Sequence, residues 1–175
     1  MKCLFSISIL GLLLLTSFHA IAQSDKSKRP SPAATLSQKV GEATITITYG
    51  QPSVKGRTIG VDLEPMPGRV WRAGANEATV FETDKDITVA GKVLPKGKYG
   101  FFILAQGDRW IIIFNKTWDQ WGAFKYKEAD DVLRDTRDVR PGTYTEKLTY
   151  KLDAAGNMNI LWGDKDIHVL IQEKK

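Results

Sequence analysis

The chain has 175 residues, a formal net charge of +5 and 42% hydrophobic residues, which suits one globular domain rather than several. It contains one cysteine, Cys3, and two histidines, His19 and His168, so zinc sites built from several cysteines or histidines are excluded. The basic residues are scattered rather than clustered, which is typical of a solvated surface and argues against nucleic-acid binding.

An export signal is predicted at the N-terminus. Lys2 supplies a positive charge, residues 4–15 are apolar, and Ala20-Ile21-Ala22 fits the small-x-small cleavage rule. This pattern predicts a signal peptide over residues 1–22. The apolar stretch is shorter than the ~20 residues that a spanning helix needs. We therefore expect an exported protein, in the periplasm or outside the cell, that does not span a membrane.

The predicted mature chain begins with a polar segment. Residues 23–34 carry two prolines and almost no apolar side chains, a composition typical of a disordered leader. No internal repeat and no second linker follow. The sequence therefore predicts a single β-rich domain over residues 35–172.

Short strand patterns begin after this leader. Ile45, Ile47 and Tyr49 alternate with threonines, which predicts one buried and one solvated strand face. Gly41-Glu42 lies just before this strand and suits a two-residue hairpin loop, because glycine readily adopts positive φ. Ala90-Gly91 suits a second tight turn, after a short strand that ends at Val89.

Two consecutive strands are apolar on both faces. Residues 99–105 and 110–115 form this pair, with Trp110, Ile112 and Phe114 pointing one way and Ile111 and Ile113 the other. A sandwich strand normally has one solvated face. We therefore expect these strands to be central and covered twice, or to line an apolar concavity with their outer face.

The C-terminal third continues in strands. Alternating patterns occupy residues 148–152, 158–162 and 167–171, with a hairpin loop at 153–157. Helical pattern is confined to Tyr126–Arg134, which predicts one or two turns. The chain is therefore predicted to be all-β, an antiparallel β-sandwich or jelly-roll-like fold with at most one or two short helical turns. An open barrel is the alternative.

Five motifs in order carry a family resemblance: YGQPSVKGR (Tyr49–Arg57), VWRAGANEAT (Val70–Thr79), LPKGKYGFF (Leu94–Phe102), IFNKTWDQWGAF (Ile113–Phe124) and DVLR (Asp131–Arg134). On these motifs the chain resembles the exported bacterial proteins grouped as domain of unknown function 2911, frequent in Bacteroidetes. The resemblance implies an extracytoplasmic β-rich domain and carries no established activity or catalytic residue. Residues 64–68 (EPMPG) depart from relatives, which tend to read L-V-P-Y-G-K there.

The first candidate site lies in the segment RVWRAGANEATVFET, residues 69–83. Trp71 could stack on a sugar ring, Arg72 could hold a carboxylate or phosphate, and Asn76 and Glu77 could bond hydroxyls. The structural alternative places Trp71 in the core, pairs Arg72 with Glu77 and lets Asn76 brace a turn.

The second candidate site follows the central strand pair. Trp118 and Trp121 flank Asp119 and Gln120. The two tryptophans could form an aromatic platform, with Asp119 and Gln120 bonding hydroxyls of a ligand. The alternative is a loop that folds back to cover the core, although loops on rigid scaffolds often carry function.

A third candidate is the turn Lys55-Gly56-Arg57, in which Arg57 could bind an anion with the help of backbone N–H groups. It lacks the full phosphate-loop pattern, which favours a solvated turn. No metal site is predicted, because residues 153–159 lack the order of a calcium loop, and no cofactor is predicted.

Carboxylates could support acid–base chemistry. Glu77 is the candidate catalytic residue, and glycoside cleavage would require a second carboxylate near it, for which Asp119 and Asp62 are the candidates. His168 lies between apolar residues of the last predicted strand, so a half-buried structural histidine is expected there.

Three functions are consistent with these patterns. The first is an exported module that binds a small polar or glycan-like ligand between the two tryptophan-containing segments. The second is a carboxylate-based hydrolase acting on saccharides. The third is a structural envelope protein, in which the apolar 99–115 hairpin packs against a partner. The sequence leaves the oligomeric state open.

Overall fold

A computed structural model describes residues 28–174. The predicted signal peptide, residues 1–22, and the first part of the predicted leader lie outside the described residues. Within residues 28–174, no helix is long and apolar enough to cross a membrane.

The described residues form ten β-strands in one antiparallel sheet. The strands are β1 (Ala33–Val40), β2 (Ala43–Gly50), β3 (Val70–Trp71), β4 (Thr79–Thr83), β5 (Ile87–Val89), β6 (Lys92–Leu94), β7 (Gly97–Gln106), β8 (Arg109–Asn115), β9 (Asp131–Leu152) and β10 (Asn157–Glu173). A 3-10 turn, Glu128–Asp130, precedes β9.

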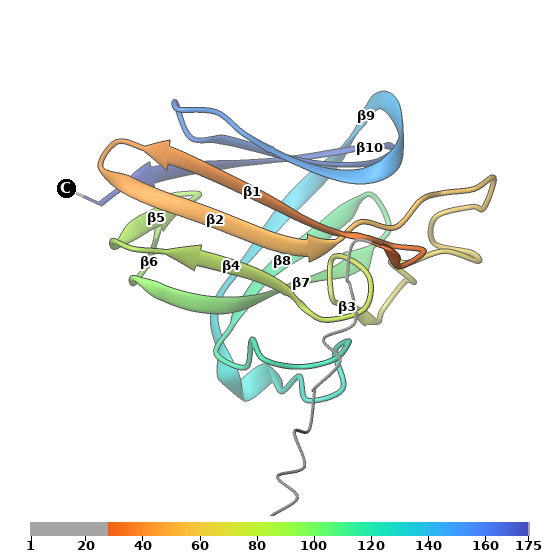
Figure 1. Ribbon diagram of the computed structural model, residues 1–175, viewed down its shortest axis with the longest axis horizontal. Coiled ribbons are helices and arrows are strands. Elements are labelled where there is room, and N and C mark those ends of the chain that lie inside the picture. The colour runs from red at the N-terminus through yellow and green to blue at the C-terminus, as the bar shows by residue number, and fades with distance from the viewer. Residues whose placement is uncertain (1–27, 175) are drawn as a thin grey trace, which may run out of the picture.

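The sheet runs in the order β1-β2-β4-β7-β8-β9-β10-β5-β6, with β3 added to β7. The long strand β9 joins its two halves. Residues 131–138 of β9 pair with β8, and residues 139–152 pair with β10. Figure 1 shows β1, β2, β4 and β7 on one side of the molecule and β10 behind them. The sheet is therefore open and folded into a sandwich-like arrangement, which confirms the predicted all-β class.

The predicted tight turns are present. Val40 pairs with Ala43 across Gly41-Glu42, and Gly41 has a φ of 61°. Val89 pairs with Lys92 across Ala90-Gly91. Positive φ is costly for most residues but not for glycine, which explains why these short turns are found at glycines.

Side-chain burial in β7 and β8 follows the predicted division into two faces. Phe101, Ile112 and Phe114 belong to the main core, which lies between the two layers. Phe102 and Ile113 belong to a second cluster on the opposite face, against which Val70, Leu104, Ile111, Ala123 and Tyr126 pack. The central strands are therefore covered twice, as predicted, and the same chain supplies the cover.

Two local expectations differ from the structure. The helical pattern of residues 126–134 is realised only as the 3-10 turn, because β9 begins at Asp131 and Leu133 pairs with Phe114 of β8. Long-range pairing thus overrides a weak local helix preference. The second difference concerns the leader, because β1 begins at Ala33 and so includes the last two residues of the range 23–34.

Candidate functional site

Backbone hydrogen bonds join the two tryptophan-containing segments. Glu77 and Trp121 form an isolated antiparallel bridge. The Ala78 N–H donates to the Gln120 carbonyl at 2.9 Å, and the Gly122 N–H donates to the Asn76 carbonyl at 3.0 Å. Segments 76–78 and 120–122 therefore lie side by side, although more than forty residues separate them in the sequence.

A compact turn presents the first segment. Ala73 and Asn76 adopt positive φ values of 51° and 66°. The Ala75 N–H donates to the Gly50 carbonyl at 3.1 Å, and the Thr79 hydroxyl donates to the Ala73 carbonyl at 3.0 Å. A Cβ on Gly50 would lie 2.1 Å from the Ala75 carbonyl oxygen, so the close approach of the turn to β2 requires glycine at this position.

A pocket of about 400 Å³ opens beside the bridged segments, between them and the ends of β1, β2 and β4. We call it the aromatic pocket. Its lining includes Arg29, Asn76, Glu77, Trp118, Gln120 and Trp121. Five of the eight residues that the sequence proposed as ligand-binding thus converge on one concavity.

Two tryptophans give this pocket its aromatic character. Trp118 is 39% exposed and Trp121 is 53% exposed, so part of each ring is accessible to solvent. Cations lie over both rings: the Arg29 guanidinium is 5.9 Å from the Trp121 centroid, and the Lys98 ammonium is 5.5 Å from the Trp118 centroid. Both distances are within the range of cation–π attraction.

Glu77 is paired with a residue that the sequence did not single out. Arg29 Nη1 donates to both carboxylate oxygens of Glu77, at 2.9 and 3.0 Å. The structural alternative had paired Glu77 with Arg72. Arg29 lies within the predicted leader, where no periodic pattern marked it. The cluster of Lys26, Lys28 and Arg29 before the prolines was the only available signal.

The polar side chains of the bridge have structural partners. Gln120 is 5% exposed, donates to the Thr117 carbonyl at 2.7 Å, and accepts from the Lys125 N–H at 2.8 Å. Asn76 donates to the Ser31 carbonyl at 2.9 Å. The bond of Asn76 fits its predicted alternative role of bracing a turn. The bonds of Gln120 hold its own loop together.

Trp71 lies in the core and does not line the aromatic pocket. It is 3% exposed, its indole Nε1 donates to the Gly74 carbonyl at 3.0 Å, and its ring stacks on Trp162 at 6.4 Å. A buried tryptophan with a satisfied N–H contributes chiefly to packing. The structural alternative for Trp71 therefore describes its main role.

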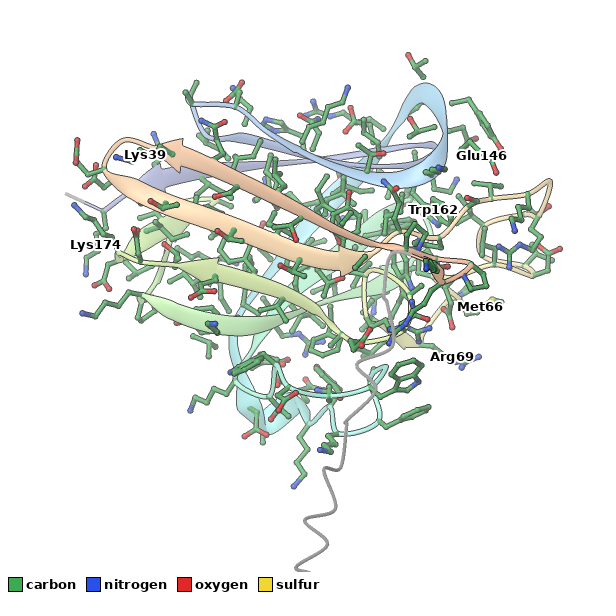
Figure 2. The ribbon with its side chains drawn as sticks, viewed as in Figure 1. Lys39, Met66, Arg69, Glu146, Trp162 and Lys174 are labelled. Carbon is green, nitrogen blue, oxygen red and sulfur yellow. The ribbon has the colours of Figure 1, made fainter. Side chains whose placement is uncertain are left out.

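The remaining two candidates, Arg57 and Arg72, line a different pocket of about 270 Å³. We call it the arginine pocket. Asp62, Glu64, Trp71 and Trp162 also line it, and the two pockets share no lining residue. Figure 2 shows Met66, Arg69 and Trp162 at this end of the molecule, opposite Lys39 and Lys174. The predicted site residues are therefore divided between two concavities.

The comparisons with known proteins agree with the resemblance found in the motifs. Residues 31–171 match the family described as "Protein of unknown function (DUF2911)". The chain belongs to this family. No curated protein and no solved structure matches the chain. The DUF2911 match includes all eight proposed ligand-binding residues, whereas Arg29 lies just before it.

His168 of the DUF2911 domain lines neither of these pockets. His168 is half-buried in β10, with Nε2 at 3.3 Å from Asn157 Oδ1, as expected for a structural histidine. Among residues 28–174, no group of three or more histidines, cysteines or carboxylates is placed to hold a metal ion.

Proposed function

We propose that this protein is an exported binding module that holds a small polar or glycan-like ligand in the aromatic pocket. The observation that carries the proposal is the pair of exposed tryptophans, Trp118 and Trp121, on a loop bonded to the rigid turn at Asn76–Glu77. Sugar rings bind proteins by stacking their C–H faces on aromatic rings while charged and amide groups bond their hydroxyls.

The volume and the chemistry of the pocket support this proposal. About 400 Å³ lies within the range of small-molecule sites. Asp119 and Lys125 also line the pocket and are exposed, so they are available to bond hydroxyl groups. The Arg29–Glu77 pair adds a charged edge next to Trp121.

The structure bears on the third function, a structural envelope protein whose apolar 99–115 hairpin packs against a partner. This function required the second face of the 99–115 hairpin to be available to a partner. That face is covered by Val70, Ala123 and Tyr126 of the same chain. The Tyr126 hydroxyl also donates to Asp131 Oδ2 at 2.8 Å, and burial, together with this bond to a carboxylate, raises the pKa of Tyr126 above its usual value. The side chains that cover this face are therefore held by a hydrogen bond as well as by apolar packing.

Alanine substitution of Trp118 or Trp121 is expected to weaken ligand binding by about tenfold or more, because each loses a stacking surface. The measurement is a titration of the purified protein with a panel of neutral and acidic oligosaccharides, followed by intrinsic tryptophan fluorescence and by calorimetry. The melting temperature of each variant is expected to stay close to that of the wild type, since both rings are largely exposed.

Tyr144→Ala serves as the matched control, because Tyr144 is an exposed aromatic residue, 58% accessible, outside the aromatic pocket. The ligand affinity of this variant is expected to equal that of the wild type. If the whole panel leaves fluorescence and melting temperature unchanged, or if the tryptophan variants bind as well as the wild type, the proposal fails.

A carboxylate-based hydrolase is the second candidate, favoured by one observation: Glu77 and Asp119 line the same pocket, whereas Asp62 lines the other. If these two carboxylates act together, Glu77→Gln is expected to lower the rate of saccharide hydrolysis by about a hundredfold or more. The measurement is reducing-sugar release from the oligosaccharides that bind. Unchanged turnover in a folded Glu77→Gln protein would exclude this role for Glu77.

A further inference from the structure

Arg72 is held in an enclosed position at the end of β3. It lies between two buried residues, Trp71 and Ala73, and its carbonyl accepts a hydrogen bond from the Thr79 N–H at 3.2 Å. These neighbours fix the backbone, so the side chain extends from a rigid base into the arginine pocket. Its Nη1 lies 3.6 Å from the position that a Cβ on Gly122 would occupy.

The guanidinium of Arg72 has no partner among the described residues. Its Nε is fully buried and donates no hydrogen bond, and no carboxylate of residues 28–174 lies within ion-pair distance of it. Several other arginines among the described residues are engaged. Arg137 pairs with Asp135, and Arg57 donates to the Val54 and Ser53 carbonyls at 3.0 and 2.7 Å. A buried donor without an acceptor is rare in folded proteins and requires an explanation.

Glu64 is the charged residue whose field acts on Arg72, yet it is engaged with its own loop. Its Oε2 accepts from the Met66 N–H at 2.7 Å, and its Oε1 lies 3.9 Å from Arg69 Nη2. Burial lowers the pKa of Arg72, and the charge of Glu64 raises it in part. Glu64 therefore moderates the cost of burying Arg72 without satisfying its donors.

The pocket around Arg72 is suited to a small anion with an apolar or sugar-like body. Leu63, Met66 and the two stacked tryptophans, Trp71 and Trp162, supply apolar walls. The two carboxylates of the lining, Asp62 and Glu64, would repel a dianionic phosphate more strongly than a carboxylate, which carries a single charge. The two terminal nitrogens of a guanidinium can donate side by side to the two oxygens of a carboxylate.

We propose that the arginine pocket is a second ligand site, which binds the carboxylate of a small molecule through the two terminal nitrogens of Arg72. Its lining residues are distinct from those of the aromatic pocket. A uronic-acid sugar and the C-terminus of a short peptide both present this carboxylate. The volume of about 270 Å³ accommodates one such residue rather than a long chain.

The test is an NMR titration of the purified protein that follows the Nε–H resonances of arginine side chains. The probes are glucuronate and N-acetylalanine, with glucose and N-acetylalanine amide as uncharged counterparts. A saturable shift of the Arg72 Nε–H with a carboxylate and none with its counterpart is the expected result. The carboxylate that shifts it at lower concentration identifies the source as sugar or peptide.

Arg72→Lys keeps the charge and removes the planar fork, so carboxylate affinity is expected to fall by about tenfold or more. Arg69→Lys is the matched control, because Arg69 is exposed and contacts Glu64 only at 3.9 Å; its affinity is expected to stay unchanged. No saturable shift in the wild type, an equal shift with the uncharged probes, or undiminished binding by a folded Arg72→Lys protein would overturn the proposal. If Arg72→Lys does not fold, the wild-type titration decides by itself.

Discussion

Trp71→Ala is expected to lower the free energy of unfolding by about 3–5 kcal/mol. The Trp71 ring is 3% exposed, stacks on the fully buried Trp162, and donates its indole N–H to the Gly74 carbonyl. Alanine removes these contacts, leaves a cavity beside Trp162, and leaves the Gly74 carbonyl without its buried donor. Urea denaturation, followed by circular dichroism, measures the loss.

Trp121→Ala is the matched control for this measurement. It deletes the same side chain at a position that is 53% exposed, where the main loss is the cation–π contact with Arg29. The free energy of unfolding is therefore expected to fall by less than about 1 kcal/mol. Equal losses in the two variants would contradict the assignment of Trp71 to the core and Trp121 to the pocket.

Asn115→Ala is expected to lower the free energy of unfolding by about 3 kcal/mol. Asn115 is fully buried at the end of β8 and has three partners. Its amide donates to the Lys127 carbonyl at 2.9 Å and to Asp131 Oδ1 at 2.7 Å, and its oxygen accepts from the Thr117 N–H at 2.9 Å. Alanine leaves the Thr117 N–H and Asp131 Oδ1 without this partner, whereas the Lys127 carbonyl keeps the bond from the Asp130 N–H at 3.0 Å.

This substitution is also expected to loosen the loop that carries Trp118 and Trp121, because Asn115 ties both ends of residues 116–127 together. Hydrogen exchange at the amides of this loop should therefore quicken more than exchange in the core strands. Asn159→Ala is the control, since Asn159 lies near the start of β10, outside this loop, and makes a single side-chain bond, to Asp166 at 2.8 Å. Unchanged loop exchange in Asn115→Ala would show that the loop is held by other contacts.

The local sequence pattern was enough to predict much of the fold. The alternation of Ile45, Ile47 and Tyr49 with threonines marks a strand whatever surrounds it, because side chains of a strand alternate between faces. Glycines at positive φ mark the turns at Gly41 and Gly91. The apolar residues on both faces of β7 and β8 predicted two covering layers, since exposing either face would cost free energy. In each case the information lies in a residue and its close neighbours.

Local pattern failed where a long-range partner decided the outcome. Residues 131–134 carry a weak helical preference, yet pairing with β8 makes them a strand. The sequence marked the segments around Glu77 and Trp121 as candidate loops, but their pairing across the bridge depends on how β4 and β8 lie in the folded sheet. Neither segment carries a periodic sequence pattern that would predict this pairing.

The sequence by itself determined the β-rich class, the hairpin turns and which short segments hold aromatic and charged residues together. Only the tertiary structure decided which side chains share a site. It paired Glu77 with Arg29, forty-eight residues away, buried Trp71, and left Arg72 in a separate pocket without an acceptor. The physical reason is that strand and turn preferences act over a few residues, whereas the partner of a charge is set by whatever packing brings within a few ångströms of it.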